Sequence, residues 1–120
     1  MNKIQALHSF WSSFGLNAYD VNSVPDDVKM PYLTHEVADD NFGNTITLSA
    51  SLWYRSSSWS EITAKEQEIA DFITRGGRMV SFDDGAIWIQ KAFPWAQRMS
   101  DVSDSMVRRI VLSVAVEFID

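Results

Sequence analysis

Residues 45–54 and 105–118 alternate between apolar and polar side chains, which is the period of a β-strand with one buried face. The apolar positions of the first stretch are Ile46, Leu48, Ala50, Leu52 and Tyr54. Those of the second stretch are Ile110, Leu112, Val114, Val116 and Phe118. The opposite face of the first strand is rich in hydroxyl groups and carries Trp53. We therefore predict two long strands, each with an apolar face.

Apolar residues recur every three or four positions in two other stretches, which is typical of amphipathic helices. In the first, residues 2–14, they are Ile4, Leu7, Phe10, Trp11 and Phe14. In the second, residues 59–75, they are Trp59, Ile62, Ile69, Phe72 and Ile73. Ser58 and Glu61 have the spacing of a capping box at the start of the second helix. Gly15 and the pair Gly76–Gly77 are expected to end the two helices.

Shorter strands are predicted at 17–21 and 31–37, with a turn at 25–27, because the two prolines in this region disfavour helix. Residues 78–93 read as a β-hairpin. Asp84 and Gly85 would form its two-residue type I′ turn, which needs positive φ at both positions. The predicted order of elements is α-β-β-β-α-β-β-β.

The last strand is long for a chain of 120 residues. Residues 105–118 would extend over about 45 Å at roughly 3.3 Å per residue. A compact domain of this length has a diameter of roughly 35 Å. The strand is therefore expected to bend, to break, or to project as an edge on which another subunit could pair.

Length and composition indicate a single domain over residues 1–120, because 46% of the residues are hydrophobic and can form a core. The chain has no cysteine, so disulfides and thiolate metal sites are excluded. No signal peptide or membrane span is predicted from its apolar runs. The formal net charge of −6 argues against a protein that coats nucleic acid, because phosphate contacts need clustered Lys and Arg.

Residues that could carry catalysis are sparse, and none forms a known catalytic motif. His8 and His35 lie far apart in the sequence, and each is interpreted as a surface or partly buried histidine. The acidic pairs are Asp26–Asp27, Asp39–Asp40 and Asp83–Asp84, and each falls where a turn is expected. We therefore predict no catalytic, cofactor-binding or metal-binding residue, and no enzyme activity.

Aromatic and arginine side chains are the candidates for a partner interface, because Trp, Tyr and Arg dominate protein–protein hot spots. The candidate residues are Trp53, Arg55, Trp88, Trp95, Arg98 and Arg109. Trp53 falls on the hydroxyl-rich face of its strand, and Trp95 is placed in a loop after Pro94. Two alternatives remain open: the first helix could cover Trp53, and Arg98, Arg108 and Arg109 could form salt bridges instead of a patch.

Several segments together resemble small tail terminator or tail-completion proteins of long-tailed bacteriophages and of Gram-positive prophages. The matching pieces run through most of the chain. They are "AYD", Pro25, "PYLTHEV", "ITLSASLWYR", "EITAKEQEIADFI" and "KAFPWAQRM".

The resemblance implies an α+β fold, in which two helices pack against a twisted and largely antiparallel sheet. It also implies a hexameric ring at the head-proximal end of the tail tube in the virion, after assembly in the host cytoplasm. The partners would be copies of the chain itself, the tail tube protein and the head connector or neck protein. DNA would pass through the ring without specific binding, and no membrane is involved.

Other functions remain open beside the tail-end ring. The chain could be a different neck or head-completion subunit, or an acidic, non-enzymatic binding module that targets a basic partner. A small enzyme is the least favoured alternative, because no catalytic constellation is present.

Overall fold

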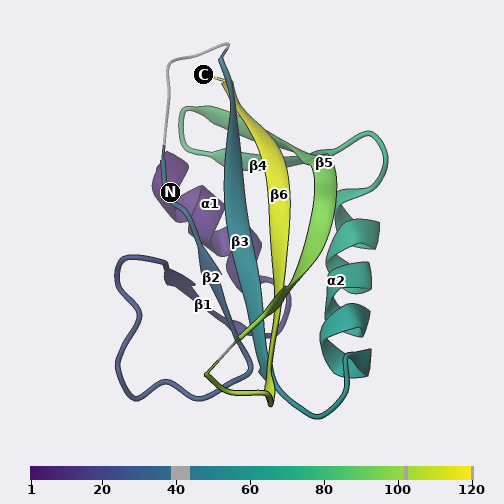
Figure 1. The fold of residues 1–120 in the computed structure, drawn as a ribbon. Helices are drawn as coiled ribbons and strands as arrows, with labels where there is room; N and C mark the ends of the chain where they lie inside the picture. The colour runs from purple at the N-terminus through teal and green to yellow at the C-terminus, as the bar shows by residue number, and fades with distance from the viewer. Residues whose placement is uncertain (39–43, 102, 120) are drawn as a thin grey trace.

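The computed structural model describes residues 1–38, 44–101 and 103–119. The predicted order of elements is confirmed (Figure 1). The elements are α1 (Lys3–Ser12), β1 (Asn17–Asp20), β2 (Tyr32–His35), β3 (Thr45–Arg55), α2 (Ser60–Ile73), β4 (Arg78–Phe82), β5 (Gly85–Ser100) and β6 (Val107–Ile119).

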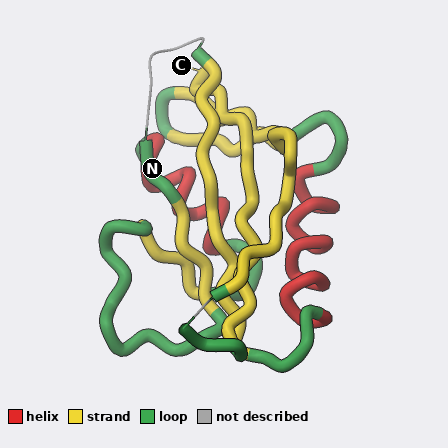
Figure 2. Tube along the Cα trace, in the orientation of Figure 1, coloured by secondary structure: helices red, strands yellow, loops and turns green. Residues whose placement is uncertain are grey.

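The strands form one six-stranded sheet in the order β1-β2-β3-β6-β5-β4. Every neighbouring pair is antiparallel except β1 and β2, which are parallel at one edge. The α+β fold is thus confirmed, with a mixed sheet that is largely antiparallel. Figure 2 shows this sheet as a twisted layer with the helices beside it.

The long last strand, β6, lies in the middle of the sheet and not at an edge, which corrects the expected projection. β3 pairs with it on one side and β5 on the other. The molecule measures 44 × 31 × 22 Å, so its long axis accommodates the whole strand. The predicted strand was too long only for a spherical domain. The domain is instead elongated, since β3 and β5, which pair with β6, are also long.

Both helices pack on one face of the sheet, which we call the inner face; the other is the outer face. α1 contacts β1, β4 and β5, and α2 contacts β3, β5 and β6. The alternation predicted for β3 and β6 is confirmed, because their apolar side chains point toward the helices and are buried in the core. The core members contributed by these two strands are Leu48, Ala50, Leu52, Tyr54, Ile110, Leu112, Val114, Val116 and Phe118.

The helix termini depart from prediction by one or two residues. α1 begins with a capping box that the sequence analysis missed: Asn2 Oδ1 accepts from the Gln5 N–H at 2.8 Å, and Gln5 Oε1 accepts from the Asn2 N–H at 3.0 Å. It ends at Ser12, and Gly15 takes the expected left-handed conformation with φ of +79°. At the end of α2, Thr74 adopts φ of +66° directly after Ile73.

The capping box predicted for Ser58 and Glu61 is wrong. Trp59 occupies the N-cap position of α2, and Ser58 Oγ accepts from the Ser60 N–H at 3.1 Å instead. The Trp59 ring lies between two guanidinium groups, 4.7 Å from that of Arg98 and 5.2 Å from that of Arg108. These contacts with β5 and β6 hold Trp59 at the helix start, so tertiary packing overrides the local capping signal.

The hairpin between β4 and β5 is confirmed, but its turn lies one residue earlier than predicted. Phe82 pairs with Gly85, which leaves Asp83 and Asp84 as the turn. Neither aspartate has positive φ, so the turn is not type I′. The chain terminus contributes to this difference, because Asp83 bonds to Met1 through both its backbone N–H and its carboxylate.

We expect Leu52→Ala to lower the free energy of unfolding by about 2–5 kcal/mol, because it would open a cavity in the core at a residue with no exposed surface. Urea denaturation would measure the change. Thr47→Ala, on the exposed side of the same strand, is the matched control and should cost less than about 1 kcal/mol. Similar losses in both variants would contradict the assignment of the buried face.

Candidate interaction surface

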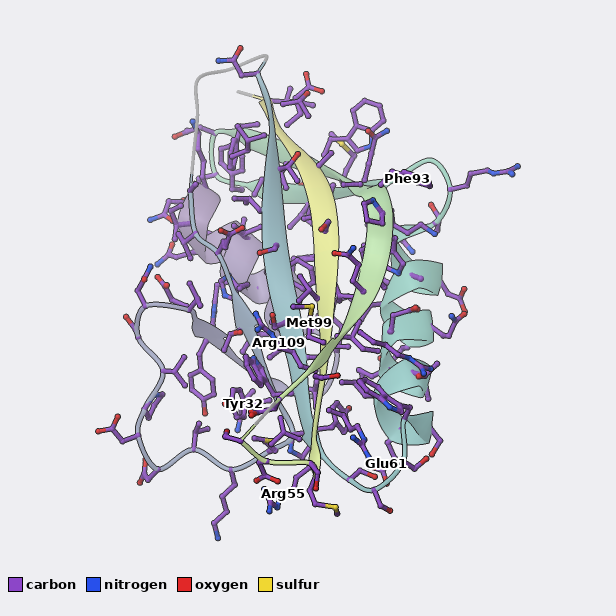
Figure 3. All side chains as sticks on the ribbon, viewed as in Figure 1. Tyr32, Arg55, Glu61, Phe93, Met99 and Arg109 are labelled. Atoms are coloured by element: carbon purple, nitrogen blue, oxygen red, sulfur yellow. The ribbon has the colours of Figure 1, made fainter. Side chains whose placement is uncertain are left out.

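A row of large side chains crosses the outer face at one end of the sheet (Figure 3). Tyr32, Trp53, Arg109 and Met99 lie directly opposite one another on β2, β3, β6 and β5. Their placement follows from the alternation of the strands, since Leu33, Leu52 and Ile110, the residues next to Tyr32, Trp53 and Arg109, point into the core. The possibility that the first helix covers Trp53 is wrong, because α1 packs on the inner face.

The members of this row stack on one another. The rings of Tyr32 and Trp53 lie 6.1 Å apart with an interplanar angle of 22°. Tyr19 meets Tyr32 edge to face at 6.0 Å. On the other side, the Arg109 guanidinium lies 4.6 Å from the centroid of the Trp53 ring, within the range of a cation–π contact. The row is therefore an ordered, partly exposed strip of aromatic surface that ends in a positive charge.

Two hydroxyl groups lie beside this row, at the next pair of positions along the strands. Thr34 and Ser51 are opposite each other and are only 6% and 5% exposed. Trp53 Nε1–H donates to Thr34 Oγ1 at 2.9 Å, and Arg109 Nε–H donates to Ser51 Oγ at 3.2 Å. These hydrogen bonds tie the aromatic row to the surface below it.

A shallow hollow of about 230 Å³ opens at this point of the outer face. Its polar wall includes Thr34, Ser51 and Arg109, with Glu36 and Ser49 at the far side. One carboxylate oxygen of Glu36 accepts from both the N–H and the hydroxyl of Ser49, at 2.6 and 2.9 Å. The hollow can thus receive a small polar group.

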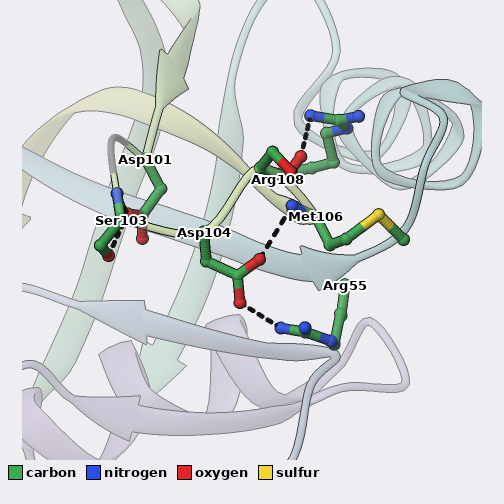
Figure 4. Close-up of polar contacts among 7 residues, drawn as sticks. Arg55, Asp101, Ser103, Asp104, Met106 and Arg108 are labelled. Atoms are coloured by element: carbon green, nitrogen blue, oxygen red, sulfur yellow. Dashed lines mark hydrogen bonds and ion pairs between the residues drawn. The ribbon is translucent and has the colours of Figure 1, made fainter.

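Arg55 lies at the end of β3 and forms an ion pair with Asp104 in the loop before β6 (Figure 4). A hydrogen bond from the Arg55 guanidinium and one from the Met106 N–H lower the pKa of Asp104. In the same loop, the hydroxyl and N–H of Ser103 lower the pKa of Asp101. Arg55 therefore has a local partner. The salt bridges expected for Arg98, Arg108 and Arg109 are not found among the described residues, whose ion pairs involve other cations.

The remaining candidates lie elsewhere. Trp88 is opposite Glu117 near the other end of the outer face, and its indole N–H donates to the Gly76 carbonyl at 3.2 Å. Trp95 lies within β5 and not in a loop, because an irregularity between Lys91 and Ala96 lets the strand continue through Pro94. Its ring packs against the core.

Arg98 belongs to the inner side of β5, where its guanidinium covers the Trp59 ring and faces Thr63 on α2. The structure thus brings Trp53 and Arg109 into one cluster, with Arg55 at the end of the same strand. It keeps Trp88, Trp95 and Arg98 apart from them.

The sequence analysis missed Tyr32, Thr34 and Ser51, which join the cluster through the pairing of β2 with β3. It also missed Phe93, whose side chain is fully exposed at 101% and projects from the irregular part of β5 (Figure 3). The proline after Phe93 was the available signal, since proline within a strand favours a bulge or an edge.

The two histidines, distant in sequence, meet between α1 and β2. His8 Nδ1 and His35 Nε2 are 3.3 Å apart, and His8 also bonds to Ser12 at 3.2 Å. His35 is buried and His8 exposed. The pKa of His35 is lowered, mainly by burial and to a lesser extent by the charge of His8. Its hydrogen bond to the Glu36 carbonyl and the charge of Asp20 act in the opposite direction.

Over residues 1–38, 44–101 and 103–119, no three His, Asp or Glu side chains gather closely enough to hold a metal ion. The acidic pair Asp39–Asp40 lies outside the described residues. Neither α1 nor α2 has the length and apolar character needed to cross a bilayer.

The fold resembles that of a protein in the virion of the native gene transfer agent (GTA) particle. The superposition has a TM-score of 0.60 and covers 95% of this chain and 89% of that one, at 17% sequence identity. No protein-family model and no curated protein matches the chain. At this identity, the likeness establishes a shared fold.

We expect the stability of the protein to fall as the pH drops below about 6.5, the pKa of an unperturbed histidine. The pKa of His35 is lower in the folded state than in the unfolded state, so at acidic pH unfolding takes up a proton there. The stability that neutral His35 contributes is therefore lost as the pH falls through the folded pKa. Urea denaturation across this pH range would measure the loss. His35→Gln should flatten the profile, and an unchanged slope in this variant would contradict the assignment.

Proposed function

We propose that this chain is a structural subunit of a phage-like virion, one that forms a ring at the head-proximal end of the tail. The ring terminates polymerisation of the tail tube and joins the tail to the head. The observation that carries the proposal is the superposition on a GTA virion protein, because it spans 95% of this chain and leaves little of either molecule unmatched. The finer assignment to the tail end rests on the sequence resemblance to tail terminators.

The distribution of exposed side chains supports assembly through side-chain contacts. A closed ring needs two different patches on each subunit, which meet head to tail. The chain presents the ordered row around Trp53 and Arg109 on the outer face, and the isolated, fully exposed Phe93 on β5. Aromatic and arginine side chains of this kind often dominate interface energetics.

The ring, which we propose to be a hexamer, contacts the tail tube protein on one side and the head connector or neck protein on the other. Its role is non-catalytic. The acidic chain, with a formal net charge of −6, suits a channel through which DNA slides, because a wall without clustered Lys and Arg does not hold phosphates. The chain acts in the virion and does not bind a membrane.

Deletion of the gene from the producing phage or prophage tests this role. We expect tails of uncontrolled length that lack heads, because nothing would stop tube polymerisation or form the joint. Electron microscopy of lysates would measure tail length, and expression of the wild-type chain in trans should restore normal particles.

Two other phenotypes would contradict the tail terminator. Tails of normal length beside unattached, filled heads would indicate the alternative neck or head-completion subunit. Intact, infectious particles would remove the virion role and favour the acidic binding module.

A further inference from the structure

The hollow on the outer face concentrates hydrogen-bond donors for which the described residues provide no acceptor. Thr34 Oγ1 and Ser51 Oγ each already accept one hydrogen bond, from Trp53 and Arg109 respectively. Each hydroxyl therefore keeps its own proton to donate. Both residues are more than nine-tenths buried and line the hollow. Buried hydroxyl protons without an acceptor are costly, so a ligand that accepts them would be favoured.

Arg109 adds a charged donor at the same place. Its Nε–H is used by Ser51, and its guanidinium is held against the Trp53 ring. Within the described part of the chain, no carboxylate pairs with its terminal amino groups. A guanidinium held in position in this way loses little freedom on binding and can grip a planar anion with two parallel hydrogen bonds.

We infer that this hollow is a carboxylate-binding site, and that its ligand is an aspartate or glutamate side chain of a neighbouring copy of this chain. The inference rests on the proposed function, because the ring supplies the neighbour.

The wall of the hollow favours a carboxylate over a phosphate. Among the described residues that line it, Arg109 is the one arginine or lysine, His35 is a buried histidine, and the carboxylate of Glu36 stands on the far side. A dianionic phosphate would meet this second negative charge, whereas a monoanionic carboxylate needs only one guanidinium and the two hydroxyls. Nucleic acid is disfavoured for the same reason, since its binding requires several clustered cations.

Charge complementarity points to a second copy as the source of the carboxylate. The chain has 16 acidic and 10 basic residues, so a neighbouring copy carries more carboxylates than cationic side chains. Glu61 and Asp71 are exposed on α2, which packs on the inner face. Figure 3 shows Glu61 near the start of this helix. Contact between the outer face of one subunit and α2 of the next would be head to tail, as a ring requires.

Nuclear magnetic resonance of the full chain tests the site itself, with sodium acetate as the probe. The Trp53 indole N–H and the Arg109 Nε–H should shift saturably with acetate and not with chloride at equal ionic strength. Arg109→Gln should weaken acetate binding by about tenfold or more, the usual effect of losing a charge-assisted hydrogen bond. Arg75→Gln, at an exposed arginine outside the hollow, is the matched control and should bind as the wild type does.

Three results would overturn the carboxylate site. These are the absence of a saturable acetate shift, an equal shift with chloride, and tighter binding of inorganic phosphate than of acetate. Ser51→Ala keeps the charge of the site and removes one hydrogen-bond donor, so it should also weaken acetate binding. This second variant keeps the test valid if Arg109→Gln fails to fold.

Sedimentation analysis of the same proteins tests the neighbouring copy. Arg109→Gln should reduce self-association, and so should the double variant Glu61→Gln/Asp71→Asn, which leaves acetate binding intact. Undiminished association in the double variant would overturn α2 as the source. If Arg109→Gln still forms rings and supports normal tails, this inference fails while the proposed function stands. A wild-type chain that binds acetate and never self-associates would overturn both the neighbouring copy and the ring.

Discussion

The alternation of apolar and polar residues in β3 and β6 is the constraint on which the rest of the molecule depends. These two strands pair over eleven residues at the centre of the sheet, and their apolar positions coincide on one face. A shift of one residue would turn every core side chain toward solvent, so burial fixes the register strongly. Both helices pack on the face that this register makes apolar, and the flanking strands extend it.

The same register builds the outer surface. Where Leu52 lies opposite Ile110 in the core, the next pair, Trp53 and Arg109, meets on the outer face. The position of this aromatic and cationic pair is therefore set by the packing beneath it. Its order comes from the central strands, which are the most constrained part of the fold. A surface held in this way loses little conformational entropy when it binds, which suits a subunit that must dock repeatedly in one geometry.

The proposed role in assembly would account for what the chain exposes. The described residues offer open, shallow hollows and side chains that engage one another, and the conspicuous features are an aromatic row, a clamped arginine and a fully exposed phenylalanine. Aromatic and arginine side chains of this kind are enriched at protein–protein interfaces. The acidic balance of the chain limits indiscriminate contact with nucleic acid, and it makes a lone, positioned arginine a selective point of attachment.

Local sequence determined which segments became helix or strand and, for most positions, which side was buried, because periodicity records exposure. Phe72, expected on the core side of α2, is an exception at 39% exposed. Local sequence also identified Trp53 and Arg109 as surface candidates. Strand order, the central place of β6, the start of α2 at Ser60 and the meeting of His8 with His35 depended on tertiary structure. The cluster of Tyr32, Thr34 and Ser51 did so too, since it exists only once β2 pairs with β3. Periodicity indicates whether a residue is buried or exposed. Which residues lie beside it in the fold depends on long-range packing, which no local pattern encodes.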